Sequence, residues 1–221
     1  MTTTTNSWNR ARIAARSRLL LATLCCAWAC LLATAAHAHA AAAEDTPTAV
    51  LRRNIEAGMA VLKDPRYRGQ AALEAQRTRL CDIAREVFDP YLFSKLALGS
   101  HWNAFSHDEQ HTFVDTFATY LCRYYLGRLQ ERYRDEQVEF VGERYLEGHR
   151  AVVTAQVLWE DRRIPVEVHM AYREQRWRAY DIQLLGVSAV RVYRTQFADV
   201  LSHATPAELI ARLREKTARN E

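Results

Sequence analysis

The 221-residue sequence has few glycines and prolines, seven and five respectively. Because both residues are common in flexible or irregular segments, their scarcity argues against long linkers between domains. Residues 44–221 also contain no internal repeat or low-complexity tract. A segment of this length suits one ordinary domain with its own apolar core. The sequence therefore predicts a single domain over residues 44–221.

The N-terminal segment has no acidic residue and follows the order of a signal peptide. Four basic residues precede an apolar run from Leu19 to about Ala36, an order typical of secretory signals. We expect cleavage at a small-x-small site between Ala38 and Ala43, and hence a signal peptide over residues 1–43. The alternative is a retained membrane anchor, because the run is near the shortest that spans a bilayer. The stop-transfer flank that a retained anchor would need is missing, which argues against this alternative. The four basic residues are Arg10, Arg12, Arg16 and Arg18.

An excess charge of one sign is lacking once this segment is removed. Thirty Lys and Arg minus the four in the segment leave 26, which equals the 26 Asp and Glu. The isoelectric point of the whole sequence, near 8.9, is therefore no evidence for a nucleic-acid partner. We expect a neutral protein secreted to the periplasm.

Only two cysteines, Cys81 and Cys122, follow the predicted signal peptide. Two cysteines in an oxidising compartment suggest one disulfide. In the chain-entropy model, closing a loop of about 40 residues adds roughly 4 kcal/mol of stability. The alternative is a pair of buried free thiols.

Apolar residues recur at helical spacing in the first part of the domain and again at its end. Thr46-Pro47 and Asp89-Pro90 have the form of an N-cap followed by proline. Ser106 to Glu109 has the form of a capping box. These signals predict helices over 47–63, about 73–87, 90–98, about 106–133, from 187 onwards and about 206–216. The helix that begins after Ser106 is expected to be the longest.

Between these helical regions the apolar residues alternate as in half-buried strands. The pattern predicts four strands, over 138–146, 151–159, about 164–172 and 177–184. Their short connections favour an antiparallel meander, so the fold class is α+β. A curved four-stranded sheet wrapped by N- and C-terminal helices can enclose an apolar pocket. Periodicity alone leaves open whether that space is a pocket or a filled core.

Seven short stretches carry a resemblance to a known family: LGSHW at 98–102, Ser106-x-x-Glu109-Gln110, Phe113-x-x-x-Phe117-x-x-x-Leu121, WRAYDI at 177–182, Gly186-Val187-Ser188, Tyr193-Arg194-x-Gln196-Phe197 and Leu209-Ile210-x-x-Leu213-x-x-Lys216. Their order and separation resemble the MlaC family of periplasmic phospholipid-binding proteins. That family includes auxiliary proteins of toluene-tolerance transport systems and the hopanoid-associated HpnM proteins. The similarity extends from about Pro47 to Lys216. The pair Cys81 and Cys122 departs from what we expect of the best-known members.

The resemblance implies a monomeric carrier that holds a phospholipid or hopanoid-type lipid in an apolar pocket. It further implies shuttling between an outer-membrane lipoprotein complex and an inner-membrane ABC transporter with a lipid-binding hexamer. A carrier of this kind needs apolar walls and no cofactor apart from the lipid ligand. The candidate lipid-binding residues lie on the predicted apolar faces: Phe113, Phe117, Leu121, Val166, Val168, Met170, Tyr180, Ile182, Val187, Val190, Tyr193 and Phe197.

Other functions have weaker support in the sequence. His107 and His111 have the spacing of a zinc site on a helix, but a third ligand is not evident and the usual glutamate position holds Asp108. Tyr180 and Asp181 could serve a ketosteroid-isomerase-like enzyme. Adjacent residues of a regular strand point to opposite faces, so we expect Asp181 to be structural. We therefore predict no metal site and no enzyme. A periplasmic protein-binding adaptor without lipid remains an alternative.

Overall fold

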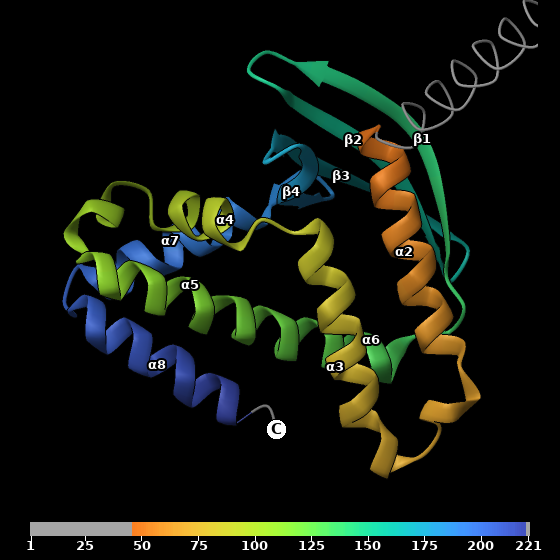
Figure 1. The fold of residues 1–221 in the computed structure, drawn as a ribbon, viewed down its shortest axis with the longest axis horizontal. Helices are drawn as coiled ribbons and strands as arrows, with labels where there is room; N and C mark the ends of the chain where they lie inside the picture. Colours follow the sequence, from red (N-terminus) through yellow and green to blue (C-terminus); the bar gives the residue numbers. More distant parts are fainter. Residues whose placement is uncertain (1–45, 220–221) are drawn as a thin grey trace, which may run out of the picture. The chain divides into compact units, whose positions relative to one another are not determined.

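The computed structural model describes residues 46–219, all within one compact unit, Asp45–Glu221. The predicted signal peptide, residues 1–43, lies outside the described residues. Helices come first, then the sheet, then two more helices (Figure 1). The α+β class predicted from the sequence is therefore confirmed.

The N-terminal helical region begins with α2 (Pro47–Lys63), α3 (Gln70–Val87) and α4 (Pro90–Leu98). After a 3-10 segment at Gly99–Ala104 it continues with α5 (His107–Leu121) and α6 (Gly127–Arg132). Local side-chain chemistry starts the helices where the sequence indicates. The side chains of Thr46 and Asp89 cap α2 and α4, and proline follows each of them. Ser106 and Glu109 form the capping box of α5.

The prediction of one long α-helix over 106–133 is wrong in one respect. A π-helical segment, Cys122–Leu126, separates α5 from α6. A π turn contains one extra residue, so the side chains after it are rotated relative to a continuous α-helix. Apolar spacing over a single turn does not distinguish a π-helical turn from an α-helical one. The spacing therefore predicted one uninterrupted α-helix.

The sheet has five antiparallel strands in the order β1-β2-β3-β4-β5, not the four predicted. The four long strands are β1 (Gln137–Leu146), β2 (Arg150–Trp159), β3 (Arg162–Arg173) and β4 (Arg176–Leu184). The fifth, β5, is only Val187–Ser188. Leu185 and Gly186 both have positive φ, 52° and 78°, as in the two-residue turns of tight hairpins. This turn pairs Val187 with Leu184 before α7 begins, and a two-residue strand is too short for alternation to reveal.

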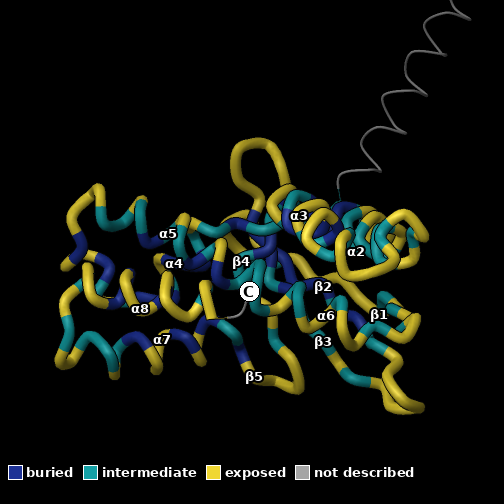
Figure 2. Tube along the Cα trace, turned by 90° about the horizontal axis from the view of Figure 1, so that it is seen from below, coloured by how far each residue is buried: buried dark blue, intermediate teal, exposed yellow. Residues whose placement is uncertain are grey.

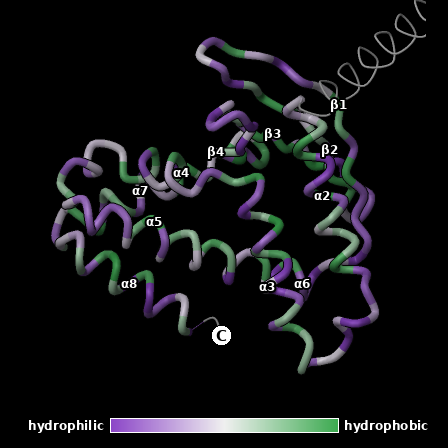
Figure 3. Tube along the Cα trace, viewed as in Figure 1, coloured by the Kyte–Doolittle hydropathy of each residue, from purple (hydrophilic) through white to green (hydrophobic). Residues whose placement is uncertain are grey.

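Helices α7 (Ala189–Leu201) and α8 (Pro206–Ala218) complete the fold. Together with α4 and α5 they form a helical layer beside the sheet, whereas α2 runs along β1 and β2 (Figure 1). In Figure 2, buried and exposed stretches alternate along α5, α7 and α8, as expected for helices with one face in a core. Hydrophobic stretches recur in α5 and in β2 and β3 (Figure 3).

Two apolar clusters form the interior. The helical cluster joins buried residues of α4, α5, α7 and α8 and contains most of the buried aromatic rings. The sheet cluster joins β2, β3 and β4 with the first turns of α2: Val50, Leu51, Ala151, Val153, Val168, Met170, Trp177 and Ala179. These two clusters decide which of the predicted lipid-binding residues are accessible to a ligand.

Candidate functional site

Half of the twelve predicted lipid-binding residues lie in the helical cluster. Phe113, Phe117 and Phe197 are at most 4% exposed. The ring of Phe117 lies 5.0 Å from that of Phe197 and 4.9 Å from that of Tyr193, centroid to centroid. Val190 is also buried there, and Leu121 packs against the cluster. These six residues therefore belong to a close-packed, largely aromatic core between helices.

Tyr193 extends this core to a partly exposed edge. Its hydroxyl oxygen lies 3.0 Å from that of Tyr125, which the π-helical segment supplies. Burial is the main cause that raises the pKa of Tyr193 above its usual value of 10. The phenol is therefore neutral at physiological pH and acts as a hydrogen-bonding aromatic group.

Two more of the predicted residues, Val168 and Met170, lie in the sheet cluster at 6% and 0% exposure. Val166 packs against the same cluster but is only half-buried. The structure thus divides the predicted set between two cores. It does not bring the twelve residues together around one enclosed pocket.

The helix-facing side of the sheet remains open at one end. The register identifies this side, because directly opposed residues of neighbouring strands share a face. Val168 opposes Ile182, and Val166 opposes Leu184. Leu184 in turn opposes Val187 in β5. These partners are accessible: Ile182 is 44% exposed, Leu184 50% and Val187 57%.

Half-buried apolar residues continue the same face across the other strands. We call the whole set the apolar strip. Its members oppose one another in the ladders or alternate with residues of the sheet cluster, and they are Val138, Phe140, Val157, Ile164, Val166, Ile182, Leu184 and Val187. Of these residues, only Val166, Ile182 and Val187 are among the twelve predicted lipid-binding residues. Strand alternation indicated the face of the others, but it could not indicate where the helices stop covering that face.

Tyr180, also predicted to bind lipid, lies at an irregularity in β4. His169 of β3 pairs with Asp181, and the next residue, Met170, pairs with Ala179. Tyr180, which lies between Asp181 and Ala179 in β4, therefore has no partner in the register. The Tyr180 ring lies 6.1 Å from the His169 ring. Since Asp181 opposes His169 and Ile182 opposes Val168, His169 belongs to the side of the sheet away from the strip.

Asp181 has the structural role expected of it. Its carboxylate is 7% exposed and accepts hydrogen bonds from the Ser188 hydroxyl at 2.6 Å and the Val190 N–H at 3.0 Å. Both oxygens are therefore used to fix the start of α7. This arrangement gives no support to a Tyr180–Asp181 catalytic pair.

Two pockets of the described residues are lined by other side chains. One, of about 390 Å³, lies at the β1 edge of the sheet and is lined by Arg52, Gln137, Val138, Glu139, Phe140, Gln156, Leu158 and Arg163. The other, of about 260 Å³, lies between α2, α3 and the β3–β4 hairpin and is lined by Val50, Arg53, Asn54, Glu86, Tyr172, Arg176 and Trp177. Neither is lined by any of the twelve predicted residues. Only the β1-edge pocket includes members of the apolar strip, Val138 and Phe140.

The histidine pair at the start of α5 lies on the surface. The Nε2 atoms of His107 and His111 are 3.3 Å apart, and both side chains are accessible. Within residues 46–219, no group of three or more His, Cys, Asp or Glu side chains could hold a metal ion. Over the same residues, no helix is both long enough and apolar enough to cross a membrane.

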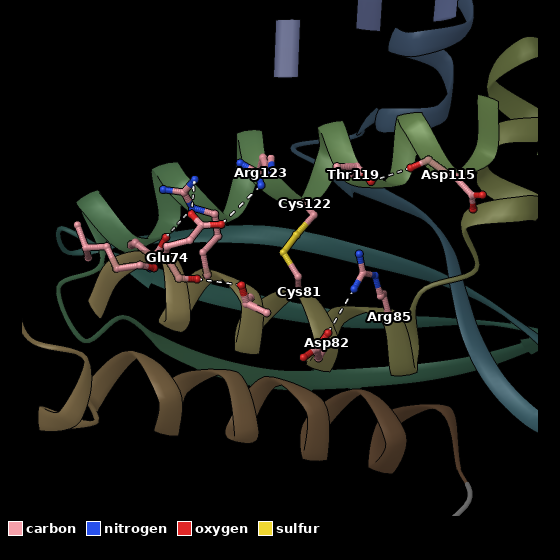
Figure 4. The surroundings of a disulfide bond; sticks show 12 residues. Glu74, Cys81, Asp82, Arg85, Asp115, Thr119, Cys122 and Arg123 are labelled. Atoms are coloured by element: carbon pink, nitrogen blue, oxygen red, sulfur yellow. Dashed lines mark hydrogen bonds and ion pairs between the residues drawn. A yellow bond between two sulfur atoms is a disulfide. The ribbon is translucent and has the colours of Figure 1, made fainter. Parts of the chain in front are cut away.

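Cys81 and Cys122 lie opposite one another on α3 and the first residue of the π-helical segment (Figure 4). The structure joins them by a disulfide, with Cα atoms 5.8 Å apart. Arg123, next to Cys122, pairs with Glu74 of α3 at 3.6 Å. The disulfide and this ion pair attach α3, which contacts β4, to the helix that carries Tyr125.

Fold and site together define an α+β domain whose antiparallel sheet is covered by helices over only part of one face. The family model described as MlaC protein matches residues 52–215, so the chain belongs to the MlaC family. The resemblance seen in the sequence is thereby confirmed. A similar solved structure is that of a phospholipid-binding protein from Ralstonia solanacearum in complex with a phospholipid. It has 23% sequence identity and a TM-score of 0.68, and the match covers 78% of this chain and 97% of that one. No curated protein matches the chain.

Proposed function

We propose that the mature protein is a periplasmic carrier that binds phospholipid, with the acyl chains lying on the apolar strip. The observation that carries the proposal is the exposure of Ile182, Leu184 and Val187 on the face that elsewhere forms the sheet cluster. Exposed apolar side chains that lie next to one another in a large patch commonly mark a binding site on a monomeric soluble protein. Family membership and the phospholipid bound to the Ralstonia protein support the same ligand class.

The physical need for such a carrier is large. Two acyl chains of about 15 methylenes each, at about 0.8 kcal/mol per methylene, give a cost of roughly 25 kcal/mol for free transfer through water. An apolar surface that replaces the bilayer around part of these chains lowers that cost. No reacting group is required, and the proposal assigns no catalytic residue and no cofactor.

The proposed route of transport follows from family membership. The carrier would receive or deliver lipid at an outer-membrane lipoprotein complex and at an inner-membrane ABC transporter with a lipid-binding hexamer. It would travel as a monomer, and its ligand would be a phospholipid or, as in the HpnM proteins, a hopanoid-type lipid. The two lipid classes differ in mass and in the presence of phosphate.

Native mass spectrometry of protein purified from the periplasm tests the proposal. We expect a bound ligand whose mass fits one lipid per chain, and extraction with organic solvent should recover it. Phosphate in the extract identifies a phospholipid, whereas a phosphate-free polycyclic lipid identifies a hopanoid. Protein that carries no lipid and does not take up lipid from vesicles would instead support the protein-binding adaptor.

A further inference from the structure

The β1-edge pocket differs from the rest of the apolar strip because it combines apolar and charged lining. By register, Val138 and Phe140 lie on the helix-facing side of the sheet, and Glu139 lies on the opposite side with Gln156. The pocket thus straddles the edge strand at the point where the strip ends. A phospholipid needs the same two environments side by side, an apolar one for its acyl chains and a charged one for its headgroup.

Arg52 of α2 lies at this boundary. The central carbon of its guanidinium group is 4.4 Å from the centroid of the Phe140 ring. Among the described residues, Arg52 forms no ion pair or hydrogen bond. Stacking on the ring orients the planar group while its N–H donors stay available. An arginine held in this way is suited to bind a phosphate.

The other polar groups of the pocket favour a single negative charge on the ligand. Arg163 donates to the carboxylate of Glu139 at 2.6 Å and to the Gln156 side-chain oxygen at 3.2 Å. Two arginines and one glutamate leave the pocket lining with a net charge of +1. The side-chain nitrogen of Gln156 adds an uncharged donor. One phosphodiester would balance this charge.

The second pocket offers a comparison with similar charge. It is lined by Arg53, Arg176 and Glu86, again two arginines and one acid. Its apolar lining comprises Trp177 and Val50 of the closed sheet cluster, each 8% exposed, and the Tyr172 ring, which is 40% exposed. No part of the apolar strip reaches it. A phospholipid whose phosphate was bound there would have the Tyr172 ring beside it, but its acyl chains would not lie on the strip.

We propose that the β1-edge pocket binds the phosphate of the phospholipid whose acyl chains lie on the apolar strip, with Arg52 as its main ligand. This inference rests on the proposed function and adds to it the ligand's orientation and headgroup chemistry. The headgroup lies at the edge strand, and the chains extend from Phe140 across the sheet towards Leu184. Free inorganic phosphate has the same donor requirement, so the experiment must separate the two sources.

The test compares Arg52→Gln with Arg53→Gln in the delipidated mature protein. The two variants remove the same charge from neighbouring positions of α2, and only the first affects the β1-edge pocket. Binding is measured by calorimetry with a short-chain phosphatidylethanolamine, with the diacylglycerol of the same chains, and with inorganic phosphate. Arg163→Gln serves as a second variant in the same pocket, and melting temperatures check that each variant is folded.

We expect Arg52→Gln to weaken phosphatidylethanolamine binding about tenfold, the effect of losing a hydrogen bond to a charged group. Arg163→Gln should weaken it in the same direction. Diacylglycerol binding should change less than about twofold, and Arg53→Gln should leave both lipids unaffected. Inorganic phosphate should bind far more weakly than the phospholipid.

Three results would overturn the inference: unchanged phospholipid binding by Arg52→Gln, an equal loss in Arg53→Gln, or inorganic phosphate that binds as tightly as the phospholipid. The last result would define a free-anion site. In each of these cases the wild-type protein still binds lipid, and the proposed function stands. A wild-type protein that binds neither lipid would overturn both.

Discussion

Single tryptophan substitutions at Val168 and Leu184 separate the closed core from the open strip. The two residues lie on the same face of neighbouring strands, but Val168 is 6% exposed and Leu184 is 50% exposed. If Val168 lined an open lipid pocket, as its place among the predicted lipid-binding residues implies, it would tolerate a larger side chain. The position of Val168 within the sheet cluster reverses that expectation.

The expected magnitudes follow from this difference in burial. Overpacking a well-filled core costs about 1 to 3 kcal/mol or more, so Val168→Trp should unfold more easily. At roughly 2 to 4 °C per kcal/mol for a domain of this size, its melting temperature should fall by about 2 to 12 °C. Leu184→Trp adds its ring in accessible space and should melt within about 2 °C of wild type. If the indole displaces about two lipid methylenes, lipid affinity should fall roughly fifteenfold.

The assay is thermal unfolding of delipidated protein, followed by reloading from vesicles and quantification of bound lipid by mass spectrometry. Delipidation is essential because a bound ligand itself raises the melting temperature. Val168→Trp that melts like wild type would show that the sheet cluster has room and that the pocket lies deeper than the strip. Leu184→Trp that retains stoichiometric lipid with wild-type affinity would refute the placement of acyl chains on the strip.

Three further predictions concern the framework. Thiol labelling of unreduced, denatured mature protein should modify almost no Cys81 or Cys122, and two labelled cysteines per chain would contradict the disulfide. Replacing both cysteines by alanine should lower the unfolding free energy by about 4 kcal/mol in the chain-entropy model. Asp181→Ala should lower the unfolding free energy measured by chemical denaturation by about 1 to 3 kcal/mol, because it leaves two buried donors at the start of α7 without an acceptor. An unchanged denaturation midpoint would be inconsistent with this role. Backbone and side-chain hydrogen bonds within the two capping boxes lower the pKa of Glu109 and Glu208 below the usual 4.5, so the stability that each adds is present above about pH 4.5 and is lost as the pH falls through the lower folded-state pKa. Double substitution of these glutamates by glutamine should therefore flatten the decline of the melting temperature below pH 4.5, and an identical decline would exclude the caps as its cause.

Much of the architecture was predictable because it depends on local signals. The N-caps at Thr46, Asp89 and Ser106 start helices where their side chains satisfy backbone N–H groups. Strand alternation and short connections gave the antiparallel meander, with the four long strands within one or two residues of their observed ends. The sequence patterns missed two short features, the two-residue strand β5 and the single π-helical segment Cys122–Leu126.

The candidate site was less predictable because accessibility is a property of packing between elements. Alternation correctly placed Val166 and Val168 on one face of β3, yet one is half-buried and the other is in a closed core. Apolar spacing likewise marked Phe117 and Phe197 as inward-facing, and both are enclosed by other rings. A sequence pattern reports that a residue avoids water. It does not report whether protein or ligand covers it.

The arrangement of open and closed regions on one sheet face suits reversible binding. The rows that contain Met170 and Trp177, near the β3–β4 hairpin, are closed by α2 and are well suited to hold the fold together. The rows that contain Leu184 and Ile164, near the other end of the same strands, keep apolar surface accessible. A ligand on the second region could enter and leave without disturbing the first, because local opening needs only the weakest contacts to yield. Apart from Phe140 and Val166, which also pack against the sheet cluster, the residues that support the fold and those that hold the lipid would then be separate sets on shared strands. Substitutions at the other positions of the strip should change lipid retention without changing the stability of the sheet.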